Sequence, residues 1–241
     1  MLKIEPIQTG SDGNLYIIKC NNVYYLLECG LKKKDILRAL FSKNLLLSNF
    51  KGCFVSHRHN DHILGAELIN QFMPIYSNRQ VMEEKKFDGE ILEPKRAYCF
   101  NGDLCVMPFN VEHGNAENYG YMFRDRDYKI LFITDVFKFE DVLKPKFDEI
   151  FIECNWTMDL MSQTLEETKD TPEYKKFERQ YQTHCSLDNL KLILENSLDL
   201  SNCKKITLIH PSKEVCNKEL VLNELRGLYP NISIEFAKNQ I

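Results

Sequence analysis

The segment from Ser56 to His62, with the sequence SHRHNDH, constrains this chain more than any other part of it. It follows a short apolar strand and precedes a predicted helix. His57 and His59 are two residues apart, so their side chains project to one side of an extended loop, and Asp61 and His62 begin the helix. Four side chains that suit zinc, manganese or iron therefore share one small volume. Since one ion cannot comfortably use all four, the segment predicts a centre with two metal ions.

An alternative explanation is a surface histidine cluster in which Asp61 only caps the helix. Three further residues at strand ends argue against it. His113 follows the apolar run LCVMPFNVE, Asp135 ends KILFITD, and His210 ends KITLIH. Each has an ordinary reading by itself, as a turn aspartate or a hydrogen-bonded histidine. Their common placement favours convergence on one sheet edge, and hence a shared metal centre.

The order of strand and helix patterns predicts the fold class. Apolar and β-branched runs indicate a hairpin (14–19 and 23–28) and several further strands, and helical spacing indicates helices that begin at Leu31 and Asp61. The predicted later strands are 52–56, 74–78, 97–100, 104–109, 119–123, 129–135, 147–153, 205–210 and 232–236, with two or three helices in 156–195 and a last helix at 216–228. Two β-rich halves that each carry helices predict an α/β protein, an αββα four-layer sandwich. We expect one domain over 1–241, with 156–195 as a helical insertion.

Composition indicates which partners and which cellular compartment to expect. The net charge of −4 argues weakly against a general nucleic-acid binder, which usually has a basic face. The first residues read as a strand and a turn, and no run has the apolar length of a signal peptide or a membrane span. The nine cysteines include no C-x-x-C pair. We therefore expect the cysteines to be unpaired and buried, to act as small hydrophobic residues, and to lie in a reducing compartment. A cytoplasmic protein with no membrane partner is expected.

The ordered motif H-x-H-x-D-H, a lone histidine, an aspartate after an apolar strand and a late histidine resembles the metallo-β-lactamase superfamily. This resemblance implies a metal-dependent hydrolase with two divalent ions, for which zinc is favoured and manganese is an alternative. It implies that a first metal is held by His57, His59 and His113, a second by Asp61, His62 and His210, and that Asp135 bridges them. A hydroxide formed between two such ions is the expected nucleophile.

Within that superfamily the chain resembles the YycJ/WalJ-like group and its phage-encoded relatives, the anti-Pycsar proteins. The matching segments are GSDGN (10–14), LLECG (26–30), SHRHNDHILG (56–65), FIECNW (151–156) and THCSLDN (183–189), together with ITD and LIHPS. The resemblance implies a phosphodiesterase that converts 3′,5′-cyclic nucleotides to nucleoside monophosphates, which would evade Pycsar antiviral signalling in the host cytoplasm if the chain is phage-encoded. It also implies a homodimer, for which we expect the helical stretch 156–195 to supply the contact. A DNA or RNA nuclease that binds nucleic acid, and a metal-binding scaffold without catalysis, are the alternatives.

Asp61 and His184 are the expected catalytic residues, Asp61 at the second metal and His184 as a proton donor to the leaving oxygen. The alternative for His184 is simple packing beside the N-cap Ser186. Glu28 stands where the group usually has Asp, and it is expected either to support a ligand histidine or to be partly exposed. Trp156 and Tyr119 are candidates for stacking on a base, although such aromatic residues more often belong to the core.

Overall fold

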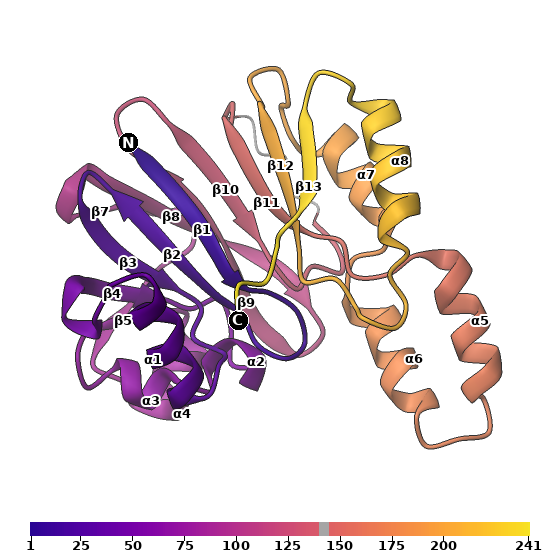
Figure 1. Cartoon of the computed structure of the whole chain (residues 1–241), viewed down its shortest axis with the longest axis horizontal. Helices are drawn as coiled ribbons and strands as arrows, with labels where there is room; N and C mark the ends of the chain where they lie inside the picture. Colours follow the sequence, from indigo (N-terminus) through magenta and orange to yellow (C-terminus); the bar gives the residue numbers. More distant parts are fainter. Residues whose placement is uncertain (140–144) are drawn as a thin grey trace. The chain divides into compact units, whose positions relative to one another are not determined.

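A computed structural model of the chain describes residues 1–139 and 145–241 (Figure 1). The described chain divides into two compact units. Unit 1 comprises residues 1–110, 116–129 and 237–241, and unit 2 comprises 111–115 and 130–236. Each unit is described by itself, and the single domain expected from the sequence stays a prediction.

Unit 1 is built on a six-stranded sheet in the order β1-β2-β3-β4-β5-β6. Strands β1 to β3 are antiparallel, which confirms the predicted hairpin, and β3 to β6 are parallel. The predicted strands at 52–56 and 74–78 are confirmed as β4 and β5, whereas the sequence reasoning left β6 unassigned. The bounds are β1 Leu2–Gln8, β2 Leu15–Cys20, β3 Val23–Leu27, β4 Phe50–Phe54, β5 Ile75–Ser77 and β6 Gly89–Ile91.

Helices α1 (Lys33–Ser42), α3 (Ala66–Ile69) and α4 (Arg79–Lys85) lie beside this sheet in Figure 1, and a short 3₁₀ turn spans Leu47–Asn49. Their apolar faces join a continuous core with the sheet; Ile36, Ala66 and Val81 are fully buried there. The helix at Leu31 is thus confirmed, with a start two residues later, and α4 was not predicted.

The single helix predicted from Asp61 is wrong, because the structure has α2 (Asn60–Ile63) and α3 with a break at Gly65. At Gly65 the backbone passes so close to neighbouring segments that a Cβ atom would lie 2.3 Å from Ile36 and 3.0 Å from the Cys29 carbonyl oxygen. The break therefore follows from packing against residues far away in the sequence, which helical periodicity does not reveal.

Unit 1 also contains β7 (Tyr98–Phe100), β9 (Ala116–Arg124) and most of β8 (Leu104–His113), from a second sheet of seven strands; a 3₁₀ turn spans Asn101–Asp103. Phe54 of the first sheet is fully buried, and its ring lies 5.2 to 5.9 Å from those of Phe100, Tyr121 and Phe123. Within unit 1, strands of the two sheets therefore pack face to face, as the sandwich pattern predicts.

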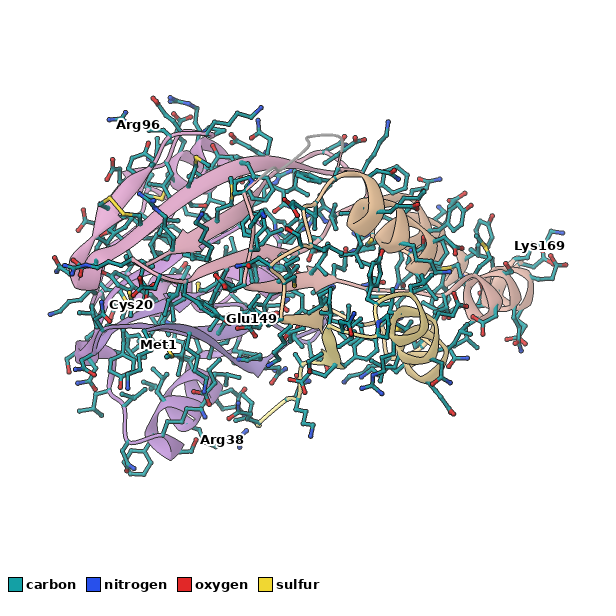
Figure 2. All side chains as sticks on the ribbon, turned by 90° about the horizontal axis from the view of Figure 1, so that it is seen from above. Met1, Cys20, Arg38, Arg96, Glu149 and Lys169 are labelled. Atoms are coloured by element: carbon teal, nitrogen blue, oxygen red, sulfur yellow. A yellow bond between two sulfur atoms is a disulfide. The ribbon has the colours of Figure 1, made fainter. Side chains whose placement is uncertain are left out.

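Cys99 and Cys105 occupy opposed positions of β7 and β8 and form a disulfide, seen among the yellow sulfur atoms of Figure 2. The expectation that all nine cysteines are unpaired small hydrophobic residues is therefore wrong for this pair. The hairpin register, with Cα atoms 4.2 Å apart, brings the two side chains together. Seven cysteines are free thiols, and six of these are buried as expected.

Unit 2 carries the strands β13-β12-β11-β10 of the second sheet, in that order. The pairs β10–β11, β11–β12 and β12–β13 are all parallel, so their carboxyl ends lie at one edge. The bounds are β10 Lys129–Ile133, β11 Glu149–Glu153, β12 Lys205–Ile209 and β13 Ser233–Phe236. These strands confirm the strand predictions made from the apolar runs at 129–135, 147–153, 205–210 and 232–236.

Three helices fill the predicted helical stretch: α5 (Met158–Thr168), α6 (Tyr174–Thr183) and α7 (Leu187–Asn196). The last helix, α8 (Lys218–Leu228), lies beside α7 in Figure 1. The α/β class with two sheets and accompanying helices is thus confirmed. Within 1–139 and 145–241, every helix is too short or too polar to span a membrane.

Candidate metal centre

The loop after β4 and the short helix α2 that follows it gather three histidines and an aspartate within unit 1, a group that we call the loop cluster (His57, His59, Asp61 and His62). His57 Nε2 lies 2.9 Å from His59 Nδ1, and the rings of His57 and His62 have centroids 4.2 Å apart. Asp61 Oδ2 lies 3.4 Å from His62 Nε2. The predicted convergence of this motif is therefore present in the structure.

Glu28 supports the loop cluster from the end of β3. Its carboxylate is fully buried, accepts a hydrogen bond of 3.2 Å from the Ser56 backbone N–H, and lies 3.3 Å from His62 Nδ1. The alternative of a partly exposed Glu28 is thereby excluded, and the residue supports a histidine as expected. Since a carboxylate only accepts, His62 donates through Nδ1–H, and its Nε2 lone pair faces both Asp61 and the Asn14 side-chain amide, which lies 3.2 Å away.

The loop 10–14 holds the same segment from its other side. The Asn14 backbone N–H donates to the Asp61 carbonyl oxygen at 2.8 Å, and the Asn14 side-chain amide reaches that oxygen at 3.1 Å. Gly30 lies against it as well, because a Cβ atom there would approach the Asp61 carbonyl oxygen to 1.6 Å. Only glycine allows so close an approach of two backbones.

A second group, the strand-end cluster, lies in unit 2 at the carboxyl edge of the parallel strands (His113, Asp135, Glu153, His184 and His210). The Asp135 carboxylate is at its centre, 3.5 Å from His113 Nε2 and 3.6 Å from His210 Nε2. One ligand atom each of Asp135, Glu153, His184 and His210 falls within 4.8 Å of the other three. His113, Asp135 and His210 are therefore brought together as predicted.

Glu153 is the member of this cluster to which sequence reasoning gave no role. It is fully buried at the end of β11, and its Oε1 lies 2.7 Å from His184 Nδ1 and 3.2 Å from His210 Nδ1. Its Oε2 accepts hydrogen bonds from the backbone N–H groups of Val136 and Cys185. Burial would raise the pKa of Glu153, but the charge of His184 and the hydrogen bonds from both histidines outweigh burial and lower it. The ionised carboxylate thus fixes two histidines at once.

These contacts determine which nitrogen each histidine presents. His113 Nδ1 lies 2.8 Å from the Thr183 carbonyl oxygen, so Nδ1–H donates there. Burial is the largest influence on the His113 imidazole and lowers its pKa, which favours the neutral ring. His210 donates through Nδ1–H to Glu153. Both histidines therefore direct Nε2 lone pairs at the Asp135 carboxylate.

Acceptor atoms that face one another across 3.4 to 3.6 Å repel each other unless a cation lies between them. The arrangement occurs at Asp61 and His62 in the loop cluster and again around Asp135 in the strand-end cluster. Imidazole nitrogen and carboxylate oxygen are the ligands of zinc and related ions, and the second nitrogen of each ring is held by a carboxylate or carbonyl group. The donor set of each cluster fits a divalent metal ion.

Two residues of the strand-end cluster, and Glu28 beside the loop cluster, have left-handed backbones although none is glycine. The φ angles are 61° at Glu28, 50° at Asp135 and 53° at His210, each just beyond a strand. Such conformations cost about 1–3 kcal/mol and persist where surrounding contacts enforce them. Here they turn a polar side chain out of the strand and into its cluster, which strand periodicity alone does not predict.

The two aromatic candidates for base stacking are buried. Tyr119 is 2% exposed and Trp156 is 3% exposed, so neither offers a ring face to a ligand. Tyr119 donates its hydroxyl to the Leu92 carbonyl oxygen, and Trp156 donates Nε1–H to the His184 carbonyl oxygen. Both are core residues, as the alternative explanation held.

Comparison with known proteins agrees with this chemistry. The family model described as "Beta-lactamase superfamily domain" matches residues 25–190, more than half of the chain. The exodeoxyribonuclease YycJ of Bacillus anthracis is 27% identical over 153 residues, which are 59% of this chain and 58% of that protein. The chain thus matches little more than half of the length of this relative.

Two solved structures share the fold over the whole chain. The metallo-β-lactamase fold protein YhfI from Bacillus subtilis has a TM-score of 0.73 at 14% identity and covers 100% of this chain and 97% of its own. A diphosphatase of the PhnP family has a TM-score of 0.67 at 17% identity and covers 100% and 96%. The family match and the histidine motif show that the chain belongs to the metallo-β-lactamase superfamily, and within it the chain is similar to the YycJ/WalJ-like group.

Proposed function

We propose that the loop cluster and the strand-end cluster together bind two divalent metal ions, with zinc favoured and manganese as the alternative, and that the chain is a metal-dependent phosphodiesterase. His57, His59 and His113 would hold the first ion. Asp61, His62 and His210 would hold the second, and Asp135 would bridge them. The observation that carries this proposal is the opposition of histidine lone pairs and carboxylates in both clusters, since bound cations convert that repulsion into attraction.

The residues beyond the ligand set support hydrolysis. Bound cations would supply charge stabilisation to a phosphate group and lower the pKa of a water molecule. His184 is outside the proposed ligand set, yet its Nδ1 is fixed by Glu153, so its Nε2 is available to a substrate. In the proposed reaction the water releases one proton to solvent and its oxygen bonds to phosphorus, the bond from phosphorus to the leaving ribose oxygen breaks, and His184 gives that oxygen a proton.

A 3′,5′-cyclic nucleotide is the substrate that we propose, with a nucleoside monophosphate as product. Support comes from charge: the chain is acidic overall, and Lys32–Lys34 is the one strong cluster of cations that we find in its sequence. Cations beside the loop cluster are paired, as in Arg58 with Glu84 at 3.0 Å and Arg79 with Glu83 at 2.6 Å. A long polyanion needs several unpaired cations in a row. Such an activity in the host cytoplasm would serve a phage as anti-Pycsar immune evasion.

A nuclease is the second candidate, favoured by one observation. The curated relative with 27% identity is named an exodeoxyribonuclease. The two candidates differ in the number of phosphates bound, so they differ in salt dependence. Binding of DNA would weaken steeply as salt rises, whereas binding of a single cyclic phosphate would change little.

We also propose a homodimer with its contact in the helical stretch 156–195. The support lies in α5, in which Met161 is the one buried residue and Met158 is 46% exposed. A helix that packs so little of its surface against its own chain has a face free for a second copy.

The first test is a substrate panel. Purified protein incubated with cyclic mononucleotides, cyclic dinucleotides and short DNA should release only nucleoside monophosphates from the first group, as measured by chromatography. His57→Ala should abolish turnover, and so should a chelator added to the native protein. Lys51→Ala, at an exposed position of β4, should leave turnover unchanged. DNA degradation with a steep salt dependence would establish the nuclease instead. Intact metal binding with no hydrolysis would leave only the scaffold.

The second test concerns Glu153. Glu153→Gln removes the charge that holds two Nδ1–H groups, so the affinity for metal should fall about 10- to 100-fold, as is usual for partners of ligand histidines. The readout is metal content after dialysis against a graded chelator. The matched control is Glu149→Gln on the same strand, whose carboxylate pairs with Lys205 at 3.4 Å. Equal metal content in both variants would count against the role of Glu153.

The third test separates His184 from the ligands. His184→Ala should keep the metal content of the native protein and reduce turnover about 10²- to 10⁴-fold, the ordinary contribution of a proton donor. The measurements are metal analysis and kcat on the same preparation. Unchanged turnover would mean that His184 only packs in the cluster.

The fourth test addresses assembly. The native chain of 28.4 kDa should elute with light-scattering mass twice that value. The double charge reversal Glu167→Lys with Lys169→Glu, at the end of α5 where Figure 2 labels Lys169, should yield monomer. The exchange Lys33→Glu with Asp35→Lys on α1, which likewise reverses one basic and one acidic residue, is the control and should leave the dimer intact. If the α5 variant stays dimeric, the contact lies elsewhere.

A further inference from the structure

Tyr181 forms an exposed aromatic surface next to the strand-end cluster. Its ring stacks on that of Trp156, with centroids 5.0 Å apart and planes inclined by 31°. Trp156 is 3% exposed, whereas Tyr181 is 40% exposed. One face of the tyrosine ring is thus covered by a buried indole, and a large part of the ring is left to solvent. An aromatic ring backed in this way is a rigid surface for a planar ligand.

Trp156 is fixed by the segment that carries His184. Its Nε1–H donates to the His184 carbonyl oxygen at 3.1 Å, and its own carbonyl oxygen accepts from the Leu187 backbone N–H at 3.0 Å. The indole also packs with Met161 and Phe177 in the small core under α5 and α6. The position of the Tyr181 ring is therefore tied to the position of His184.

Tyr181 is also close to His184 along the chain. It lies in α6, three residues before His184, which is the extended residue at the carboxyl end of that helix. The neighbouring Gln180 donates to Asn155, which in turn donates to the His210 carbonyl oxygen at 2.8 Å. The carboxyl end of α6 thus borders the strand-end cluster at two points. The exposed ring of Tyr181 is thus connected through Trp156 to His184, the residue that we propose to act at the phosphate.

We propose that Tyr181, backed by Trp156, is a stacking platform for the base of the nucleotide substrate. This inference rests on the proposed function. It names the residues that would bind the base, whereas the two clusters would bind only the phosphate. Stacking accepts purines and pyrimidines alike, because every base has a π face. The platform therefore favours nucleotides over phosphodiesters without a base and discriminates weakly among bases.

The test compares ligands with and without a base on the metal-loaded protein. The native protein should bind adenosine 5′-monophosphate about 5- to 100-fold more tightly than ribose 5-phosphate, the range expected for stacking on one aromatic side chain. Tyr181→Leu, which keeps an apolar cover over Trp156, should lose most of this ratio and leave the affinity for ribose 5-phosphate unchanged. Tyr181→Phe should retain the ratio. Tyr174→Ala, at the start of the same helix, is the matched control.

Adenosine without phosphate separates this inference from the proposed function. Trp156 is the only tryptophan of the chain, so its fluorescence reports on the platform. Adenosine should alter that fluorescence in the native protein and in Tyr181→Phe but not in Tyr181→Leu, whether or not cyclic nucleotides are hydrolysed. An equal ratio of the two phosphates in native protein and Tyr181→Leu, or no response to adenosine, overturns the platform. Failure to hydrolyse cyclic nucleotides overturns only the proposed function.

Discussion

The buried carboxylate of Glu153 is the contact on which the geometry of the strand-end cluster depends. An ionised carboxylate without water is costly unless donors surround it. Here two histidine rings and two backbone N–H groups, from the segments after β10, before α7 and after β12, all converge on it. Because one anion satisfies donors from three segments, these segments cannot shift independently, and the histidine nitrogens that face Asp135 are held in place.

In unit 1 a second buried glutamate, Glu28, also fixes a histidine. Glu28 is buried at the end of β3, turns into the site through a left-handed backbone and fixes His62 by its Nδ1 atom. The longer side chain of glutamate, compared with the aspartate usual in the resembling group, still reaches both His62 and the Ser56 N–H. In each unit a buried glutamate therefore prepares a histidine to present Nε2, which is the requirement for a metal ligand.

The residues that we propose as metal ligands stand out in the sequence because their signals are local. Four of them lie in six consecutive residues, and His113, Asp135 and His210 follow apolar strands. Other features depend on distant partners and left no local signal: the helix break at Gly65 follows from contact with Cys29 and Ile36, and the disulfide follows from hairpin register. Glu153 is intermediate. It ends a strand as the predicted ligands do, but its role becomes visible only with His184 and His210 in place.

The ligand set alone does not specify a substrate, since relatives of this chain carry names as different as exodeoxyribonuclease and diphosphatase. Specificity must come from surfaces around the proposed metal ligands, and in unit 2 the surface that we propose is the carboxyl end of α6. The hydrogen bond from Trp156 to the His184 carbonyl group joins the exposed Tyr181 ring to the proposed proton donor. A ligand that displaces Tyr181 would therefore also move His184, and recognition of the base would be coupled to the position of the proton that the leaving oxygen needs.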